Sequence, residues 1–337
     1  MNSQGLHSRI VVLVRSKKEK NMSKIMNFIK NVSPFNNRTE MPTLLYVIKV
    51  ILLFWVCKFG SELVGEVIVL AVHFACGKNP LQGEMFDSKT IMLMTYFGYA
   101  FIICAIFLFW KLFQKKSVIE LGFTGKPVSY LTGALIGAVL LVIAVVITVL
   151  TGAIRFNGVF RNIDTKMVAA MFICFVLQSA MEEILCRGVV HQLLIKKTSV
   201  PVTVGVSAAL FTIPHLSSME GGSPLIVAVG VVNLILVSII FSLVTMRSRG
   251  IWAACGLHSM WNYILYSILG LNLSGIDENI AAVFDMRSVG SNILNGGEYG
   301  IEASIITTVV LAFGVLILIC LNLTYEYLRD NIRMNKR

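Results

Sequence analysis

The chain has 337 residues, of which 56% are apolar and only 14% carry a charged side chain. An ordinary soluble domain has about 25% charged residues, so this composition excludes a soluble globular enzyme and indicates a polytopic membrane protein. A membrane chain of this length is expected to form one helical bundle rather than several domains.

The net charge of +11 does not indicate a nucleic-acid partner, because the basic residues that cause it gather beside apolar segments. Basic residues in such places report the orientation of membrane spans and favour anionic lipid. We therefore expect an integral membrane protein whose partner is the lipid bilayer, with no nucleic acid bound. The basic residues before the first and after the last apolar segment are Arg9, Arg15, Lys17, Lys18, Lys20, Lys24, Lys30, Arg38, Arg329, Arg333, Lys336 and Arg337.

A basic extension is predicted at each end of the chain. Residues 1–40 and 326–337 hold no apolar segment long enough to span a membrane, and we expect both on the cytoplasmic side. No cleavable signal peptide is recognised in the first extension, because a compact apolar core followed by small residues is missing there. Met22 is a candidate for the true start of the protein.

Between the extensions, the apolar segments predict an all-α fold, a polytopic membrane helical bundle with about eight transmembrane helices. Residues 41–116 would form the first two helices and residues 117–325 a core made by the other six. Gly133 and Gly137 are four residues apart, which permits close contact between helices. The predicted helices cover residues 44–76, 90–110, 130–150, 165–197, 201–217, 224–246, 252–271 and 301–323, and residues 152–166 and 272–300 are expected to be loops.

The segment 165–197 carries two adjacent acids and an arginine inside an otherwise apolar helix. Charged groups at that depth are costly and indicate a functional site. Glu183 and Arg187 are four residues apart, so they share a helix face and can form an ion pair. Glu182 is rotated from Glu183 by roughly 100°. Since its own helix offers no obvious partner, Glu182 is expected to find partners on other helices.

Three polar residues on later helices are candidates for those partners. His258 and Asn262 are four residues apart and present donors to the same space. His215 follows Pro214, which should kink or end its helix. Counted from the flanking basic residues, Glu182 and His258 lie roughly 21 and 16 Å deep, near the middle of a ~30 Å hydrocarbon layer. The sequence therefore predicts one site built by three helices.

A carboxylate together with imidazoles suits hydrolysis. Glu182 could take a proton from a water molecule that His215 orients. His258 and Asn262 could then bind the oxyanion formed at an attacked carbonyl group. Alternatively, Glu182, His215 and His258 could hold a catalytic zinc ion with one position open for water. The HExxH signature of soluble zinc proteases is missing, so no cofactor is favoured and zinc stays the alternative.

Three short motifs, in this order on three apolar helices, resemble those of the CPBP family. The family comprises type II CAAX prenyl endopeptidases and bacterial relatives tied to bacteriocin processing and self-immunity (Abi). The resemblance covers roughly residues 117–325. The motifs are Glu182-Glu183-x-x-x-Arg187, Phe211-x-x-x-His215 and His258-x-x-x-Asn262.

The resemblance implies an eight-helix intramembrane endopeptidase. The family has been described both as metalloproteases and as metal-independent glutamic proteases, and we favour the second mechanism here. The roles that the resemblance implies are water activation by Glu182, an oxyanion site of His215, His258 and Asn262, and support from Glu183 and Arg187, with Phe211 packing to shape the site.

We therefore expect an endopeptidase that cuts a membrane-anchored or apolar peptide or protein, as in CAAX-type, bacteriocin or pheromone processing. Its site is expected to be reached from the cytoplasmic side of a bacterial cell membrane, with both termini in the cytoplasm. The alternative is a non-catalytic immunity or interaction protein that protects its host from a membrane-active peptide. A transporter is disfavoured, because no inverted pair of broken helices is seen.

Overall fold

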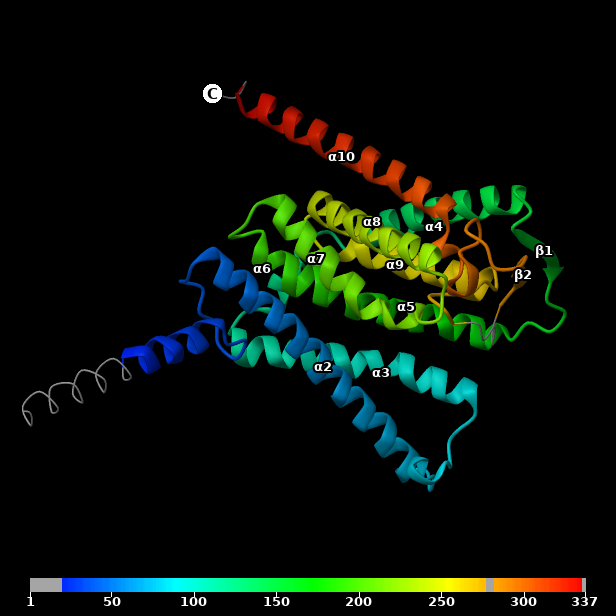
Figure 1. Ribbon diagram of the computed structural model, residues 1–337, viewed down its shortest axis with the longest axis horizontal. Coiled ribbons are helices and arrows are strands. Elements are labelled where there is room, and N and C mark those ends of the chain that lie inside the picture. Colours follow the sequence, from blue (N-terminus) through cyan, green and yellow to red (C-terminus); the bar gives the residue numbers. More distant parts are fainter. Residues whose placement is uncertain (1–19, 277–281, 335–337) are drawn as a thin grey trace, which may run out of the picture.

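The computed structural model describes residues 20–276 and 282–334, and within the last helix it describes side chains through Leu323. Regular structure in this part of the chain is almost entirely helical (Figure 1). The predicted all-α membrane bundle is therefore confirmed. The helices are α2 (Thr43–Ala75), α3 (Ser88–Phe109), α4 (Ser129–Leu150), α5 (Thr165–Glu183), α6 (Gln192–Leu194), α7 (Val200–His215), α8 (Pro224–Ser248), α9 (Trp252–Tyr263) and α10 (Ile305–Met334).

Each of the eight predicted spans contains a helix, but only six helices among the described residues are long and apolar enough to cross a membrane. α7 is a shorter apolar helix of 16 residues. α9 has 12 residues, several of them polar, before it continues as a π-helical turn over Ile264–Ile268. Both helices are shorter than the ~20 residues that a transmembrane helix needs.

The predicted extensions at the two ends of the chain are partly helical. Residues 20–32 form a helix, and residues 1–19 lie outside the described part. The Gln114 side-chain amide donates to the carbonyl of Pro34 at 2.8 Å, so the segment after this helix packs against the end of α3. α10 continues to Met334, and the predicted tail 326–337 is, up to that residue, the end of this helix.

Two segments that the sequence assigned to loops pair as strands. β1 (Ile154–Val159) runs antiparallel to β2 (Phe284–Ser288), with Arg155 opposite Arg287. The prediction of loops was wrong here because the two partners lie far apart in the sequence. A weak signal was present, since both segments alternate apolar and polar residues.

α9 lies at the centre of the bundle and is in backbone contact with α4. A Cβ atom added to Gly256 would lie 2.0 Å from the carbonyl oxygen of Tyr130, and one added to Gly133 would lie 1.8 Å from that of Ala253. The Tyr130 and Ser259 hydroxyls are 2.6 Å apart across the same contact. The close helix contact predicted at Gly133 is therefore present, and it fixes the position of α9.

The bundle has two distinct ends. We call the first the terminal end. There Thr124 donates to the carbonyl of Arg249, and Lys197 donates to that of Thr39. Figure 1 shows that the helical residues 20–32 and the end of α10 both point toward this end. At the opposite end, which we call the loop end, β1 and β2 pair. There the Val289 amide donates to the carbonyl of Ala153 at 2.9 Å.

Candidate active site

The two adjacent acids stand at the C-terminal end of α5. Directly after Glu183 the helix becomes a π-helical turn over Ile184–His191. Such turns are rare and are frequently found at functional sites. The turn keeps Arg187 against Glu183, with 3.3 Å between Nη1 and Oε1, and both side chains are fully buried. The predicted ion pair is present.

Arg187 is held by hydrogen bonds to Ser238 and by two neighbouring aromatic rings. Its Nη2 donates to the carbonyl of Ser238 at 2.8 Å and to the hydroxyl of the same residue at 2.5 Å. The guanidinium carbon lies 5.1 Å from the centre of the Phe211 ring and 4.9 Å from that of Phe241. A buried charge is tolerated only when it is paired and hydrogen-bonded, and cation–π contacts add to that pairing. Arg187 is thus a rigid anchor between α5, α7 and α8.

His258 contacts both acids. Its Nδ1 donates to Oε1 of Glu183 at 3.1 Å, so this carboxylate oxygen is shared between His258 and Arg187. The imidazole also stacks on Phe241, with 4.9 Å between ring centres. Because Nδ1 carries the proton that Glu183 accepts, Nε2 is left facing Glu182, 3.9 Å from its Oε2.

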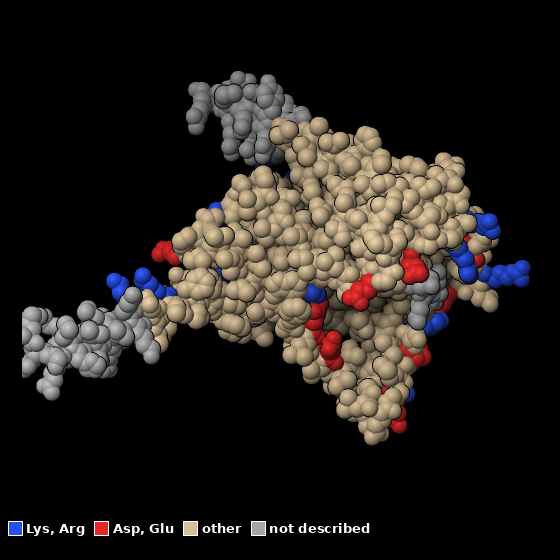
Figure 2. Space-filling view, viewed as in Figure 1, with Lys and Arg blue, Asp and Glu red and all other residues tan. Residues whose placement is uncertain are grey.

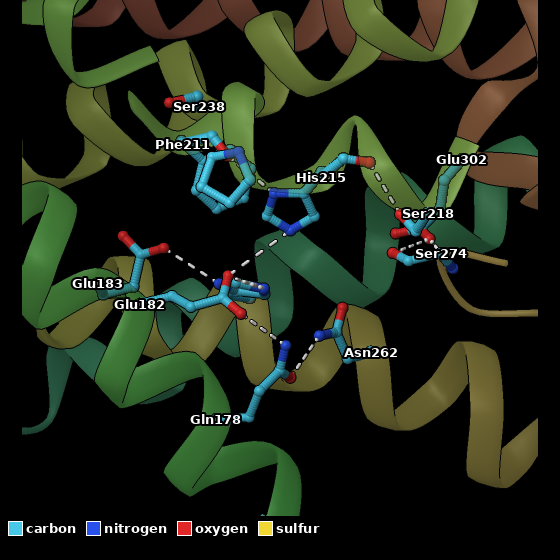
Figure 3. Close-up of polar contacts among 12 residues, drawn as sticks. Gln178, Glu182, Glu183, Phe211, His215, Ser218, Ser238, Asn262, Ser274 and Glu302 are labelled. Carbon is cyan, nitrogen blue, oxygen red and sulfur yellow. Dashed lines mark hydrogen bonds and ion pairs between the residues drawn. The ribbon is translucent and has the colours of Figure 1, made fainter. Parts of the chain in front are cut away.

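His215 reaches the same atom of Glu182 from the end of α7. Its Nδ1 donates to the carbonyl of Phe211 at 2.8 Å, and a carbonyl oxygen can only accept, so the proton lies on Nδ1. The Nε2 atom of His215 is 3.9 Å from Oε2 of Glu182 (Figure 3). This separation is too long for a direct hydrogen bond. One water molecule about 2.8 Å from each atom would bridge it.

Asn262 reaches Glu182 through a residue that the sequence analysis missed. The Asn262 amide donates to Oε1 of Gln178 at 2.9 Å, and Gln178 Nε2 donates to Oε1 of Glu182 at 2.9 Å (Figure 3). The expectation that Glu182 has no partner on its own helix was wrong. Gln178 stands four residues before Glu182, so the spacing rule that paired Glu183 with Arg187 would have found it.

A third carboxylate, Glu302, was also missed. It precedes α10, and its Oε2 accepts from the backbone N–H and the hydroxyl of Ser274 at 2.7 and 2.9 Å. Its Oε1 accepts from the indole N–H of Trp261 at 3.2 Å. Glu302 thus ties the segment around Ser274 to α9 beside the candidate site. Its partners are 28 and 41 residues away, beyond the reach of any local pattern.

The candidate residues surround two adjoining cavities. The main cavity, of about 250 Å³, is lined by Gln178, His258 and Asn262 together with Glu302 and apolar residues of α8 and α10. The side cavity, of about 170 Å³, is lined by Glu182 and by residues of α2 and α7. The residues that line both cavities are Phe211, His215 and Ser218. Glu182 and His215 therefore stand where a bound peptide could lie across the junction.

The predicted zinc ligands come together, but their placement does not suit the ion. Each histidine donates its Nδ1 proton away from the junction, as metal-binding histidines do. However, both Nε2 atoms lie 3.9 Å from Oε2 of Glu182, whereas ligands of a tetrahedral zinc ion are ~3.3 Å apart. Across residues 20–276 and 282–323, no group of three His, Cys, Asp or Glu side chains is arranged to hold a metal ion.

Comparison with known proteins supports the resemblance that the motifs suggested. Residues 164–264 match the family described as type II CAAX prenyl endopeptidase, Rce1-like. This part of the chain is similar to that family. The matched segment runs from the start of α5 to the end of α9 and holds all seven motif residues, while the resemblance was expected over roughly 117–325. No curated protein and no solved structure matches the chain.

Proposed function

We propose that the protein is an intramembrane endopeptidase in which Glu182 activates water. The observation that carries this proposal is the convergence of three atoms at the cavity junction: Oε2 of Glu182 lies 3.9 Å from Nε2 of both His215 and His258. Oε2 of Glu182 accepts, and so does Nε2 of His215, because Nδ1 carries the ring proton. Two acceptors this far apart suit a water molecule that donates a proton to each.

In the proposed reaction, the bridging water attacks a peptide carbonyl while its proton passes to Glu182. General-base help of this kind contributes roughly 10²–10⁴-fold to a rate. The proton then goes to the leaving amine, either from Glu182 or by way of Nε2 of His215. Because Nδ1 of His215 is held by the Phe211 carbonyl, the ring can exchange protons only through Nε2, which faces the junction.

The oxyanion of the tetrahedral intermediate needs donors at the same place. Glu183 accepts from Nδ1 of His258, and its negative charge favours the imidazolium form, whose Nε2–H points into the junction. The Asn262 amide uses one N–H on Gln178 and has a second N–H to give. Donors held in place before the reaction are the usual source of oxyanion stabilisation.

The test compares peptides in membranes of cells that make the wild-type protein, Glu182→Gln or Glu66→Gln. Glu66 is a matched control, since it is an exposed glutamate on the spanning helix α2, outside both cavities. We expect a defined set of uncut peptides to accumulate with Glu182→Gln and not with Glu66→Gln. Identical peptide sets in all three samples would contradict proteolysis.

Two further readouts separate the alternatives. If the protein protects cells from a membrane-active peptide, protection that survives Glu182→Gln favours the non-catalytic immunity protein. If cleavage by the purified wild-type protein is lost with a strong chelator and restored by zinc, the metal-free mechanism is wrong. We expect cleavage to survive the chelator.

A further inference from the structure

The cavities at the catalytic junction are lined by residues from the loop end of the bundle. His215 is the last residue of α7, and Ser218, three residues further on, lines both the main and the side cavity. The main cavity is lined on the same side by Leu273, Ser274 and Ile276, which belong to the segment between α9 and α10. The junction is therefore bounded by loop residues at one end of the molecule.

A third cavity, of about 230 Å³, continues from Ser218 toward the surface at that end. Its lining is made by the turn between α7 and α8, with Glu220 and Ser223, and by the segment before α10, with Ser291 and Glu298. Tyr299 lies between this cavity and Ser274 and Ser218. Polar side chains thus lead from the surface of the loop end to the junction, which a water-consuming reaction requires.

The two ends of the bundle differ strongly in charge. At the terminal end, described basic residues far outnumber the acids Glu40 and Glu120, whereas basic and acidic residues balance at the loop end. Figure 2 shows mostly blue side chains toward the terminal end and mixed red and blue side chains at the loop end. The basic residues in the terminal-end segments are Lys20, Lys24, Lys30, Arg38, Lys111, Lys115, Lys116, Lys126, Lys196, Lys197, Arg247 and Arg249. The charged residues at the loop end are Lys78, Lys89, Arg155, Arg161, Lys166 and Arg287, with Glu84, Asp87, Asp164, Glu220, Asp285 and Glu298.

An excess of Lys and Arg in short loops marks the cytoplasmic side of a membrane protein. From the charge difference and the position of the cavities, we infer that the catalytic junction opens away from the cytoplasm. It would receive an apolar segment of a peptide or membrane protein that has already crossed the membrane. This inference rests on the proposed function for its substrate, but the orientation itself rests only on the geometry and the charges.

The inference replaces one expectation from the sequence. Residues 20–32 and the end of α10 lie at the terminal end, whereas the third cavity lies at the loop end. A terminal end in the cytoplasm is therefore incompatible with a site reached from the cytoplasm. The apolar part of the main cavity, formed by Leu234, Val237 and Phe241 of α8 together with Leu311 of α10, would hold the apolar side chains of such a substrate.

The test labels single cysteines in intact cells with a charged maleimide that does not cross membranes. Two matched variants, Ser291→Cys at the loop end and Ser199→Cys at the terminal end, place the thiol on exposed serines, and the Ser199 hydroxyl makes no helix-capping bond. The three exposed cysteines, Cys76, Cys104 and Cys320, are first replaced by alanine, while the other four are buried.

We expect Ser291→Cys to be labelled in intact cells and Ser199→Cys only after the membrane is opened. Labelling of Ser199→Cys in intact cells, or protection of Ser291→Cys in them, overturns the inference. The labelling is repeated in the Glu182→Gln background, where the same pattern is expected. Orientation is thereby measured without cleavage, so the inference and the proposed function fail on different results.

Discussion

Glu182 and Glu183 are neighbours in the chain, yet they belong to two differently built regions. We call the surroundings of Glu183 the fixed half of the site. There the Glu183 carboxylate contacts Arg187 at 3.3 Å and His258 at 3.1 Å, and its side chain is 0% exposed. We call the surroundings of Glu182 the open half of the site. There Oε2 of Glu182 is 3.9 Å from Nε2 of both His215 and His258, and the Glu182 side chain is 18% exposed. His258 contacts both acids.

The difference follows from helix geometry. One residue turns a helix by roughly 100°, so consecutive glutamates face different surroundings on the same element. Glu183 faces the Arg187 guanidinium, which lies against the Phe211 and Phe241 rings, and its side chain is fully buried. Glu182 faces the junction of two cavities. Oε2 of each glutamate is without a hydrogen-bond partner among the described residues, but only Glu182, which is 18% exposed, presents that oxygen beside a cavity. Such an oxygen is suited to bind a water molecule.

The largest effect is expected from breaking the fixed half. Glu183→Ala leaves Arg187 as a buried charge without its carboxylate, and the loss of one partner of a buried pair costs about 3–5 kcal/mol of folding free energy. Thermal unfolding of the purified protein in detergent measures this loss. Glu182→Ala is the control and should lower stability far less. Equal losses for the two variants would show that the halves do not differ in this way.

A second variant moves the residue that joins the two halves. Gly256→Ala places a methyl group against the Tyr130 carbonyl, which pushes α9 and His258 away from α4 and costs about 1–3 kcal/mol as overpacking. The matched control is Gly205→Ala in α7, where an added Cβ would meet nothing within 4 Å. Unfolding in detergent should show destabilisation at 256 and none at 205; an equally tolerated Gly256→Ala would contradict the close contact.

Removing the support of the open half should affect cleavage rather than folding. Gln178→Ala deletes the hydrogen bonds to Glu182 and to Asn262. A hydrogen bond to a charged group is worth about 1.5–3 kcal/mol, so we expect the turnover rate to fall roughly tenfold to a hundredfold. The unfolding midpoint should stay close to that of the wild type. A normal rate would mean that Gln178 does not orient the two residues.

The smallest effect concerns the start of α5, the helix that carries both halves. The backbone N–H of Met167 and then the ammonium of Lys89 lower the pKa of Asp164 from 3.8, because both stabilise the carboxylate. The stabilisation is therefore present above the ordinary carboxyl pKa and is lost as pH falls through the lowered value. Asn also caps helices well, so Asp164→Asn should unfold like the wild type at pH 7 and lose less stability between pH 5 and 3. An unchanged acid profile would rule out this contribution.

Local spacing predicted much of the fixed half. The four-residue spacing of Glu183 and Arg187 predicted their ion pair, and the apolar segments predicted the positions of α5, α7 and α9. The same rule, applied to Gln178 and Glu182, would have supplied the missing partner of the open half. Opposite charge did not indicate this pair, because the side chain of Gln178 is an uncharged amide.

The rest depended on contacts between distant parts of the chain. Glu302 meets Ser274 and Trp261 only because the segment before α10 folds back over α9. The pairing of β1 with β2 and the position of the cavities at the loop end arise in the same way. Such contacts depend on how the segments between the helices return to the bundle, which no periodicity in the sequence encodes.

The most direct test of the account measures the turnover rate of Glu182→Gln on a peptide that accumulates in its presence. With unfolding identical to that of the wild type, the rate should fall roughly 10²–10⁴-fold, because the water loses its proton acceptor. A correctly folded Glu182→Gln protein that cuts this peptide at the wild-type rate would contradict the central role of Glu182.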